Sequence, residues 1–202
     1  MIGIIDYGMG NIHSVKKALQ LLGGEVAVVN KPAQLKKCAK AVLPGVGAFG
    51  DALDEMNKRG LTEASRDFIN SGKPFLGICL GMHILFDSSA ESPRVKGLGV
   101  LKGRVVKFAD RKGIKVPHMG WNEIKPVADK CFLFKGLGQK QCVYFCHSYY
   151  PELKDENNIS ATTDYGINFA CAVHKDNIYG VQFHPEKSQK VGLKILKNFI
   201  NL

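Results

Sequence analysis

Short apolar runs alternate with longer amphipathic stretches over the first ninety residues of the chain. The short runs have the length and composition of buried strands, and the longer stretches have apolar residues at helical spacing. Strands and helices that alternate in this way predict a parallel sheet with helices on both faces. The predicted strands are 2–5, 25–29, 41–43 and 75–78, and the predicted helices are 12–22 with Asn11 as its cap, 51–71 with a break near Gly60, and 82–88.

The pattern changes in the second half, where apolar segments are separated by short turns. Segments of this kind predict antiparallel hairpins. The last residues, 188–202, have apolar positions at helical spacing and predict an amphipathic helix. The sequence therefore predicts one α/β domain over residues 1–202, an open, mostly parallel sheet with helices on both faces plus an antiparallel hairpin addition. The strands predicted here are 99–108, 120–125, 141–149, 168–173 and 178–183.

Composition narrows the class of protein. Hydrophobic residues make up 45% and charged residues 23% of the 202 positions, values typical of a globular domain. The net charge is +10, but the lysines are scattered, so a basic face for an acidic protein or a phosphorylated substrate is favoured over nucleic-acid binding. No run is long enough for a membrane span, and the first residues lack the features of a signal peptide, so we expect a cytoplasmic protein.

The six cysteines do not form a CxxC pair, which argues against a zinc site, and no metal or cofactor is expected. Without a secretion signal they are expected to be reduced thiols. One of them has a distinctive context: Gly77-Ile78-Cys79-Leu80-Gly81 lies where a predicted strand meets a predicted helix. That arrangement is typical of a nucleophile elbow, with a thiolate favoured by the helix N-terminus. Taken alone, the pentapeptide fits a buried core cysteine equally well.

His184-Pro185-Glu186 supplies the groups that would activate such a thiol. Pro185 favours an extended backbone at His184, and residues two apart in an extended segment point the same way. Glu186 can then hydrogen-bond one imidazole nitrogen while the other faces the sulfur, as in a nucleophile–base–orienter triad. The segment also follows a predicted strand, where sites of open α/β sheets gather.

Pro44-Gly45-Val46-Gly47 follows another predicted strand. Attack on an amide creates an oxyanion, which needs backbone N–H donors. A loop with Gly45 and Val46 can supply one donor, and Leu80, directly after the candidate nucleophile, can supply a second. Alone, the loop also fits a plain turn.

Together these elements resemble the class I, triad-type glutamine amidotransferases. Within that class the chain is similar to the glutaminase subunits of imidazole glycerol phosphate synthases over essentially its whole length. GICLG and HPE mark only the broad class, whereas PGVGAFG, KVPHMGWN and HPEKS are specific. The segments that carry the resemblance are IDYGMGNIHSV, LPGVGAFGDA, GICLGMHILF, KVPHMGWNEI, YFCHSYY and YGVQFHPEKS.

The resemblance implies a reaction. Glutamine forms a thioester with Cys79, His184 acts as base and acid, and Glu186 orients the histidine. The released ammonia crosses into a separate (β/α)₈ barrel synthase subunit, which makes imidazole glycerol phosphate and an aminoimidazole carboxamide ribotide. The matching glutamine-binding positions are Gly47, Glu91, His147, Ser148 and Tyr149, and those near the partner interface are Asn11, Trp121, Tyr144 and Lys187.

The chain departs from the family pattern at one position. Four residues after the nucleophile the family usually has a glutamine whose amide holds the substrate, and here the residue is His83. Because the unperturbed pKa of histidine is about 6.5, we expect His83 to change charge near neutrality and to tune glutamine binding. Its position one helical turn after Cys79 predicts a side chain at the mouth of the pocket.

Three other functions are open to the sequence. A paralogue with the same glutaminase chemistry would feed a different synthase, for example in the amidination of surface sugars. An inactive relative would only bind and regulate a partner, but Cys79, His184 and Glu186 are all present. A cysteine peptidase or hydrolase could share the elbow, yet it would have no use for the PGVG loop or the PHMGWN segment.

Overall fold

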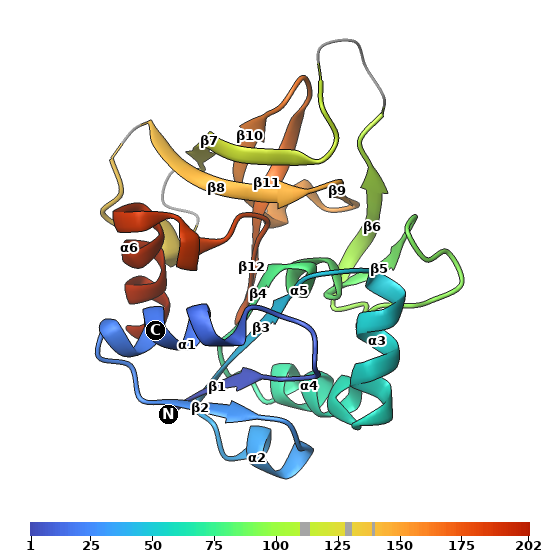
Figure 1. Ribbon diagram of the computed structural model, residues 1–202, viewed down its shortest axis with the longest axis vertical. Helices are drawn as coiled ribbons and strands as arrows, with labels where there is room; N and C mark the ends of the chain where they lie inside the picture. The colour runs from blue at the N-terminus through green and yellow to red at the C-terminus, as the bar shows by residue number, and fades with distance from the viewer. Residues whose placement is uncertain (110–113, 128–130, 139) are drawn as a thin grey trace.

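A computed structural model describes residues 1–109, 114–127, 131–138 and 140–202 (Figure 1). Strands and helices alternate in the first half as the hydrophobic pattern predicts. These elements are β1 (Ile2–Ile5), α1 (Ile12–Leu21), β2 (Val26–Val29), α2 (Pro32–Lys36), β3 (Lys40–Gly45), α3 (Phe49–Lys58), α4 (Leu61–Asn70), β4 (Phe75–Cys79) and α5 (Leu80–His83).

The second half is rich in strands and ends in a helix. Its elements are β5 (Phe86–Ser89), β6 (Leu101–Lys107), β7 (His118–Pro126), β8 (Gln141–His147), β9 (Tyr149–Leu153), β10 (Ile159–Asp164), β11 (Asn168–Lys175), β12 (Ile178–Val181) and α6 (Gln189–Ile200). Three short 3₁₀ turns are η1 (Phe132–Phe134), η2 (Glu156–Asn158) and η3 (Pro185–Lys187). None of the helices in the described ranges has the length and apolar character needed to span a membrane.

Nine strands form one sheet in the order β2-β1-β3-β4-β12-β11-β10-β7-β8. Neighbours from β2 to β12 are parallel, and neighbours from β12 to β8 are antiparallel. The predicted fold class is confirmed, with four strands in the antiparallel addition. Because β12 runs parallel to β4, with Val181 opposite Ile78, the chain segments that follow both strands reach the same edge of the sheet.

Helices cover both faces of the parallel strands, and side-chain alternation explains why. In β1, Ile2 and Ile4 pack in the hydrophobic cluster that contains α1 and α6, whereas Ile5 packs in the cluster of α2, α3 and α4. Figure 1 shows α1 and α6 together on one side of these strands. Strands buried on both faces are apolar throughout, which is why the short runs identify them so clearly.

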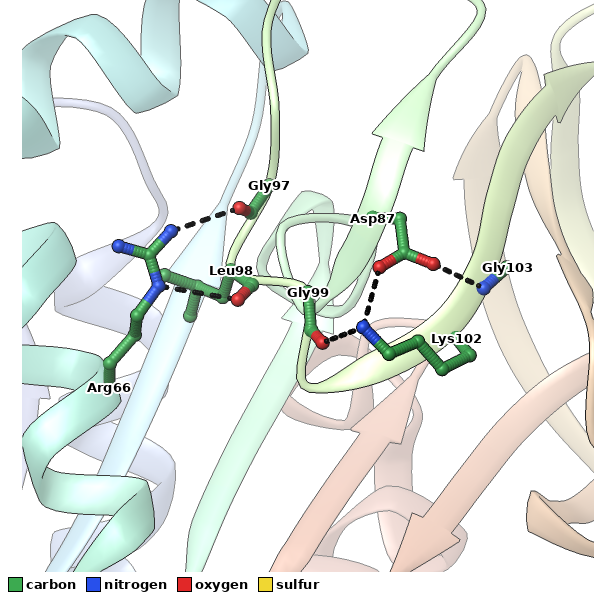
Figure 2. Close-up of polar contacts among 7 residues, drawn as sticks. All are labelled: Arg66, Asp87, Gly97, Leu98, Gly99, Lys102 and Gly103. Carbon is green, nitrogen blue, oxygen red and sulfur yellow. Dashed lines mark hydrogen bonds and ion pairs between the residues drawn. The ribbon is translucent and has the colours of Figure 1, made fainter.

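A second, three-stranded sheet, β5-β6-β9, lies beside the large one. Figure 2 shows how polar contacts hold the chain around it. Arg66 on α4 donates to the carbonyl oxygens of Gly97 and Leu98 at 3.2 and 3.3 Å. The Asp87 carboxylate on β5 accepts from the backbone N–H of Gly103 on β6 at 3.0 Å. These contacts anchor both sides of the segment between β5 and β6, which carries Glu91.

Several predicted elements are wrong in detail. The helix predicted over 82–88 ends at His83, and residues 86–89 form β5 instead. A run buried on all sides has no period that distinguishes helix from strand. The predicted strand 141–149 is two strands, β8 and β9, in different sheets, and α2 and β10 were not predicted. Asn11 is at the N-cap position of α1, but its side chain makes no capping hydrogen bond with the described residues.

Candidate active site

Cys79 lies on a sharp turn between β4 and α5. Its backbone φ of 54° and ψ of −111° are in a region that non-glycine residues rarely adopt. The glycines on either side permit the turn: a Cβ at Gly77 would lie 2.6 Å from the Gly81 carbonyl oxygen, and a Cβ at Gly81 would lie 1.8 Å from that of Leu43. The strand and the helix can therefore approach closely, which is the geometry of a nucleophile elbow.

His184 and Glu186 follow β12 and reach the same edge of the sheet as Cys79. The Nδ1 atom of His184 lies 2.9 Å from Oε1 of Glu186, and both side chains are buried. The backbone at His184 is extended as predicted, but the expectation that the segment stays extended to Glu186 was wrong, because residues 185–187 form the 3₁₀ turn η3. The carboxylate reaches back to the histidine because the chain turns after His184, while the Ser188 hydroxyl donates to the His184 carbonyl.

The electrostatics of this pair favour a protonated imidazole. Burial by itself lowers the pKa of His184, but the hydrogen bonds and negative charges of Cys79 and Glu186 outweigh it and raise the pKa to about 10. A protonated histidine held beside the sulfur favours the reactive thiolate form of a cysteine. The arrangement therefore supplies a nucleophile and a proton donor for a leaving amine.

A cavity of about 310 Å³ opens over Cys79. Its walls contain most of the residues that the sequence singled out, although they come from five separate segments of the chain. A larger hollow of about 540 Å³ lies between α2 and α4, but among the described residues its lining holds no cysteine or histidine. The walls of the cavity over Cys79 are Val46, Gly47, Cys79, Leu80, His83, Glu91, Pro117, Cys146, His147, Ser148, Tyr149, His184 and Lys187.

The predicted oxyanion donors lie next to the sulfur. Gly45 is opposite Cys79 in the register of β3 and β4, and Val46 and Gly47 continue from it into the cavity wall. Gly45 is packed so tightly that a Cβ would lie 2.5 Å from the Tyr7 hydroxyl oxygen. Leu80 is the first residue of α5, and the first N–H groups of a helix have no intrahelical acceptor. The start of α5 can therefore present an N–H group to an anion, and the loop at Gly45–Gly47 lies beside it.

Glu91 lines the cavity and also contacts the N-terminus of the helix α3. Its Oε2 accepts a hydrogen bond from the backbone N–H of Phe49, the first residue of α3, at 2.8 Å. A carboxylate at a helix N-terminus is stabilised by the helix dipole. Glu91 thus brings a negative charge to the wall, as a site for an amino group requires, while also holding α3 in place.

His83 differs from its prediction. It lies in the cavity wall but is buried, and its Nε2 atom is 2.8 Å from Oε1 of Gln182. Burial lowers the pKa of His83 to about 4, and the hydrogen bond to Gln182 only partly opposes this effect. The expectation that His83 sits at the pocket mouth and changes charge near neutrality is therefore wrong.

Gln182 is a site residue that sequence reasoning missed. Its side chain is buried between His83 and the sulfur, with Nε2 3.9 Å from Sγ of Cys79. The signal was present in the sequence, because Gln182 lies in the predicted strand 178–183 and precedes His184 by two positions. Pro117 and Cys146 also line the cavity without having been singled out.

We expect the KM for glutamine to be independent of pH between about 6 and 8.5, because a histidine with a pKa of about 4 stays neutral there. His83→Gln should alter KM while leaving this profile flat.

The buried neutral histidine also makes the stability of the chain depend on pH. The contribution of His83 to the free energy of unfolding is fully present above the unfolded pKa of about 6.5. It is lost as the pH falls toward 4, because the unfolded chain takes up a proton that the buried ring does not. The free energy of unfolding should therefore fall by about 2 kcal/mol between pH 7 and pH 5.

Urea denaturation of the parent chain and of His83→Gln at pH 7 and pH 5 measures this loss. The variant should lose less stability on acidification than the parent. A KM for the parent that changes several-fold between pH 6 and pH 8 and becomes flat in His83→Gln would contradict the assignment of a neutral His83.

Three of the four residues predicted to lie near a partner, Trp121, Tyr144 and Lys187, contact one another in turn. Trp121 is 50% exposed and contacts the Tyr144 ring edge-on, with the centroids 6.2 Å apart. The Nζ atom of Lys187 lies over the Tyr144 ring, 5.8 Å from its centroid, and Lys187 also lines the cavity. Asn11 is partly buried at the start of α1. An exposed tryptophan beside an exposed methionine, Met119, is unusual on a surface that meets only water.

Within the described ranges, no group of three or more histidine, cysteine or acidic side chains is arranged to hold a metal ion. The chemistry that the site can perform by its own residues is attack of a thiolate on a carbonyl carbon, with an imidazolium as proton donor and backbone N–H groups for the oxyanion.

Comparisons with known proteins agree with this geometry. Residues 3–202 match the family described as glutamine amidotransferase class-I. Proteins named imidazole glycerol phosphate synthase subunit HisH are 48% identical in Syntrophotalea carbinolica, over 98% of both chains, and 48% identical in Methanocaldococcus jannaschii, over 100% of both chains. The fold is similar to the structure of PurLQS from Thermotoga maritima, with a TM-score of 0.79, 19% identity and coverage of 99% of this chain and 97% of that one.

Proposed function

The chain belongs to the class-I glutamine amidotransferases and, among them, to the HisH subunits of imidazole glycerol phosphate synthase, and on this premise we propose how its residues perform the reaction. It is an enzyme that hydrolyses glutamine for histidine biosynthesis. The observation that carries the mechanism is the elbow at Cys79 facing a cavity walled by His184, whose Nδ1 is held 2.9 Å from Glu186.

Cys79 is the nucleophile. Its thiolate attacks the side-chain amide carbon of glutamine, and the carbonyl oxygen becomes an oxyanion that accepts hydrogen bonds from the N–H of Leu80 and from the loop at Gly45 and Val46. His184 gives its proton to the departing nitrogen, so ammonia leaves and a thioester remains. Water then attacks the thioester, His184 takes a proton from it, and glutamate is released with the thiolate restored.

The cavity wall holds the rest of the substrate. Glu91 attracts the ammonium group of glutamine, and Gly47 and the segment 147–149 supply backbone and side-chain contacts to its carboxylate and amide. Neutral His83 acts through its hydrogen bond to Gln182 instead of through a charge. Glutamine-sized ligands fit a pocket of a few hundred Å³.

The ammonia passes to the other subunit of the synthase. We assign that subunit a (β/α)₈ barrel fold and a docking face that covers Asn11, Trp121, Tyr144 and Lys187. Transfer across this heterodimer interface would supply the nitrogen for imidazole glycerol phosphate and leave aminoimidazole carboxamide ribotide as second product. The chain acts as a single domain over residues 1–202, in the cytoplasm, without cofactor, membrane or nucleic acid. The HisH relatives favour this partner over a synthase for surface sugars or a purely regulatory role.

Labelled glutamine tests the transfer of ammonia. In the complex with its partner, glutamine labelled with ¹⁵N in the side-chain amide should deliver the label to imidazole glycerol phosphate even when excess unlabelled ammonium is present. An interior route limits exchange with solvent, so the isotope content of the product should stay far above that of the ammonium pool, after correction for the synthesis from ammonium alone. Mass spectrometry measures it. Dilution of the label to the level of the ammonium pool would contradict a direct transfer.

A further inference from the structure

Two buried histidines on neighbouring strands lie side by side at the edge of the glutamine cavity. His118 on β7 is opposite His147 on β8, and Nδ1 of His118 is 3.0 Å from Nε2 of His147. His147 lines the cavity, and His118 lies behind it, bordering an outer hollow that also contains Trp121 and Asn122. The mechanism proposed above leaves His118 without a role.

The side-chain amide of Asn122, which contacts His118 from the outer hollow, determines the direction of the hydrogen bond between the two rings. Asn122 accepts from the backbone N–H of Glu123 through Oδ1 at 2.8 Å and donates to the Asp164 carbonyl through Nδ2 at 2.7 Å. Since an N–H only donates and a carbonyl only accepts, the orientation of this amide is determined. Its Nδ2 is 3.3 Å from Nε2 of His118, so that ring nitrogen accepts and the proton of His118 is on Nδ1.

The contact of His147 with the Tyr149 carbonyl independently gives the same direction for the hydrogen bond between the two rings. Nδ1 of His147 lies 2.8 Å from the carbonyl oxygen of Tyr149, so Nδ1 carries the proton of His147. Its Nε2 therefore accepts from Nδ1–H of His118. Burial lowers the pKa of His118 to about 4 and that of His147 well below its usual value, so both rings are neutral near pH 7. A second proton on either ring would place two donors face to face.

The hydrogen bonds that run from Asn122 through His118 and His147 to Tyr149 hold the backbone that forms part of the cavity wall. The carbonyl of Tyr149 belongs to the turn 147–149, where the chain leaves β8 of the large sheet and enters β9 of the small one. Both ring nitrogens of His147 are engaged inside the protein, so its side chain supports this turn and does not bind glutamine through a ring nitrogen. The ring of His118 is itself stacked between Phe145 and Tyr165, with centroids 4.5 and 4.0 Å away.

We propose that His118 is a positioning residue for glutamine binding: its Nδ1–H fixes the ring of His147, which in turn fixes the turn 147–149 against the cavity. The proposal rests on the proposed function, because it names glutamine as the ligand of that cavity. The KVPHMGWN segment, which carries the exposed Trp121, would then also act inside the subunit through His118.

Two substitutions separate hydrogen bonding from packing at this position. His118→Phe keeps a planar ring between Phe145 and Tyr165 but removes the donor, leaving a buried acceptor on His147 without its partner. His118→Asn loses the ring but places an amide N–H near the position of Nδ1. In the complex with the partner subunit, His118→Phe should raise the KM for glutamine roughly tenfold with kcat within about twofold, because an unpaired buried polar group is costly. His118→Asn should stay within about threefold of the parent KM.

The opposite order, with His118→Phe near the parent and His118→Asn impaired, would show that the ring acts by packing and would overturn the proposal. So would an equal fall of kcat in both variants without a change in KM. NMR of the parent chain labelled with ¹⁵N at its histidine rings gives a readout that needs no activity. His118 and His147 should both be neutral with the proton on Nδ1 at pH 7, and a proton on Nε2 of His147 would refute the inference even if the glutaminase function stands.

Discussion

Replacing Cys79 with alanine is expected to lower glutamine hydrolysis by the complex at least about 10⁴-fold. No thioester can form without the sulfur, and the remaining groups can only stabilise attack by water. The fold should survive, because alanine is smaller and Cys79 contributes no disulfide. Steady-state release of glutamate from glutamine measures the loss.

A matched control is Cys146→Ala, which removes the second thiol that lines the same cavity. It should retain most of the activity, because Cys146 is on strand β8 and not on the elbow. Synthesis from added ammonium salt should persist in the Cys79→Ala complex, since that route bypasses glutamine. Glutamate release by Cys79→Ala at a rate close to that of Cys146→Ala would show that another group is the nucleophile.

The partner subunit, with its nucleotide bound, is expected to accelerate glutamine hydrolysis on the order of 10²–10³-fold over the isolated chain. Loss of one oxyanion donor typically costs this factor, so a single peptide in the loop at Gly45–Gly47 that is misaligned in the free chain would explain it. The loop is suited to such a change, because Gly47 has a φ of +93° and Val46 is exposed. Glutamate production is measured with the isolated chain, with partner alone and with partner plus nucleotide.

Trp121→Ala should weaken this activation without changing the basal rate, because Trp121 is exposed on β7 and does not line the cavity. Leu21→Ala is the matched control, since Leu21 is also an exposed large apolar side chain but lies at the end of α1, away from β7 (Figure 1). An isolated chain that is already fully active would refute the expectation, as would equal effects of the two substitutions.

The positions that carry the chemistry could be located from the sequence because they depend on short, local patterns. The strand, the elbow at Cys79 and the following helix are adjacent in the chain, and glycines are required wherever strand and helix approach closely. Parallel strands place the segments that follow them at one edge of the sheet, so Gly47, Cys79 and His184 could be expected to meet there. Gln182 was missed, although it lies two positions before His184 and just after β12.

Only the tertiary structure decided the properties that depend on burial and on contacts between distant segments. His83 has the sequence context of a titrating residue, but burial keeps it neutral although its hydrogen bond with Gln182 partly opposes this effect. The pairing of β7 with β8 joins His118 to His147, twenty-nine positions later, and no spacing in the sequence predicts the direction of their hydrogen bond. Local backbone preferences determine where a nucleophile can be presented, whereas the proton positions around it depend on desolvation by residues that are remote in the chain.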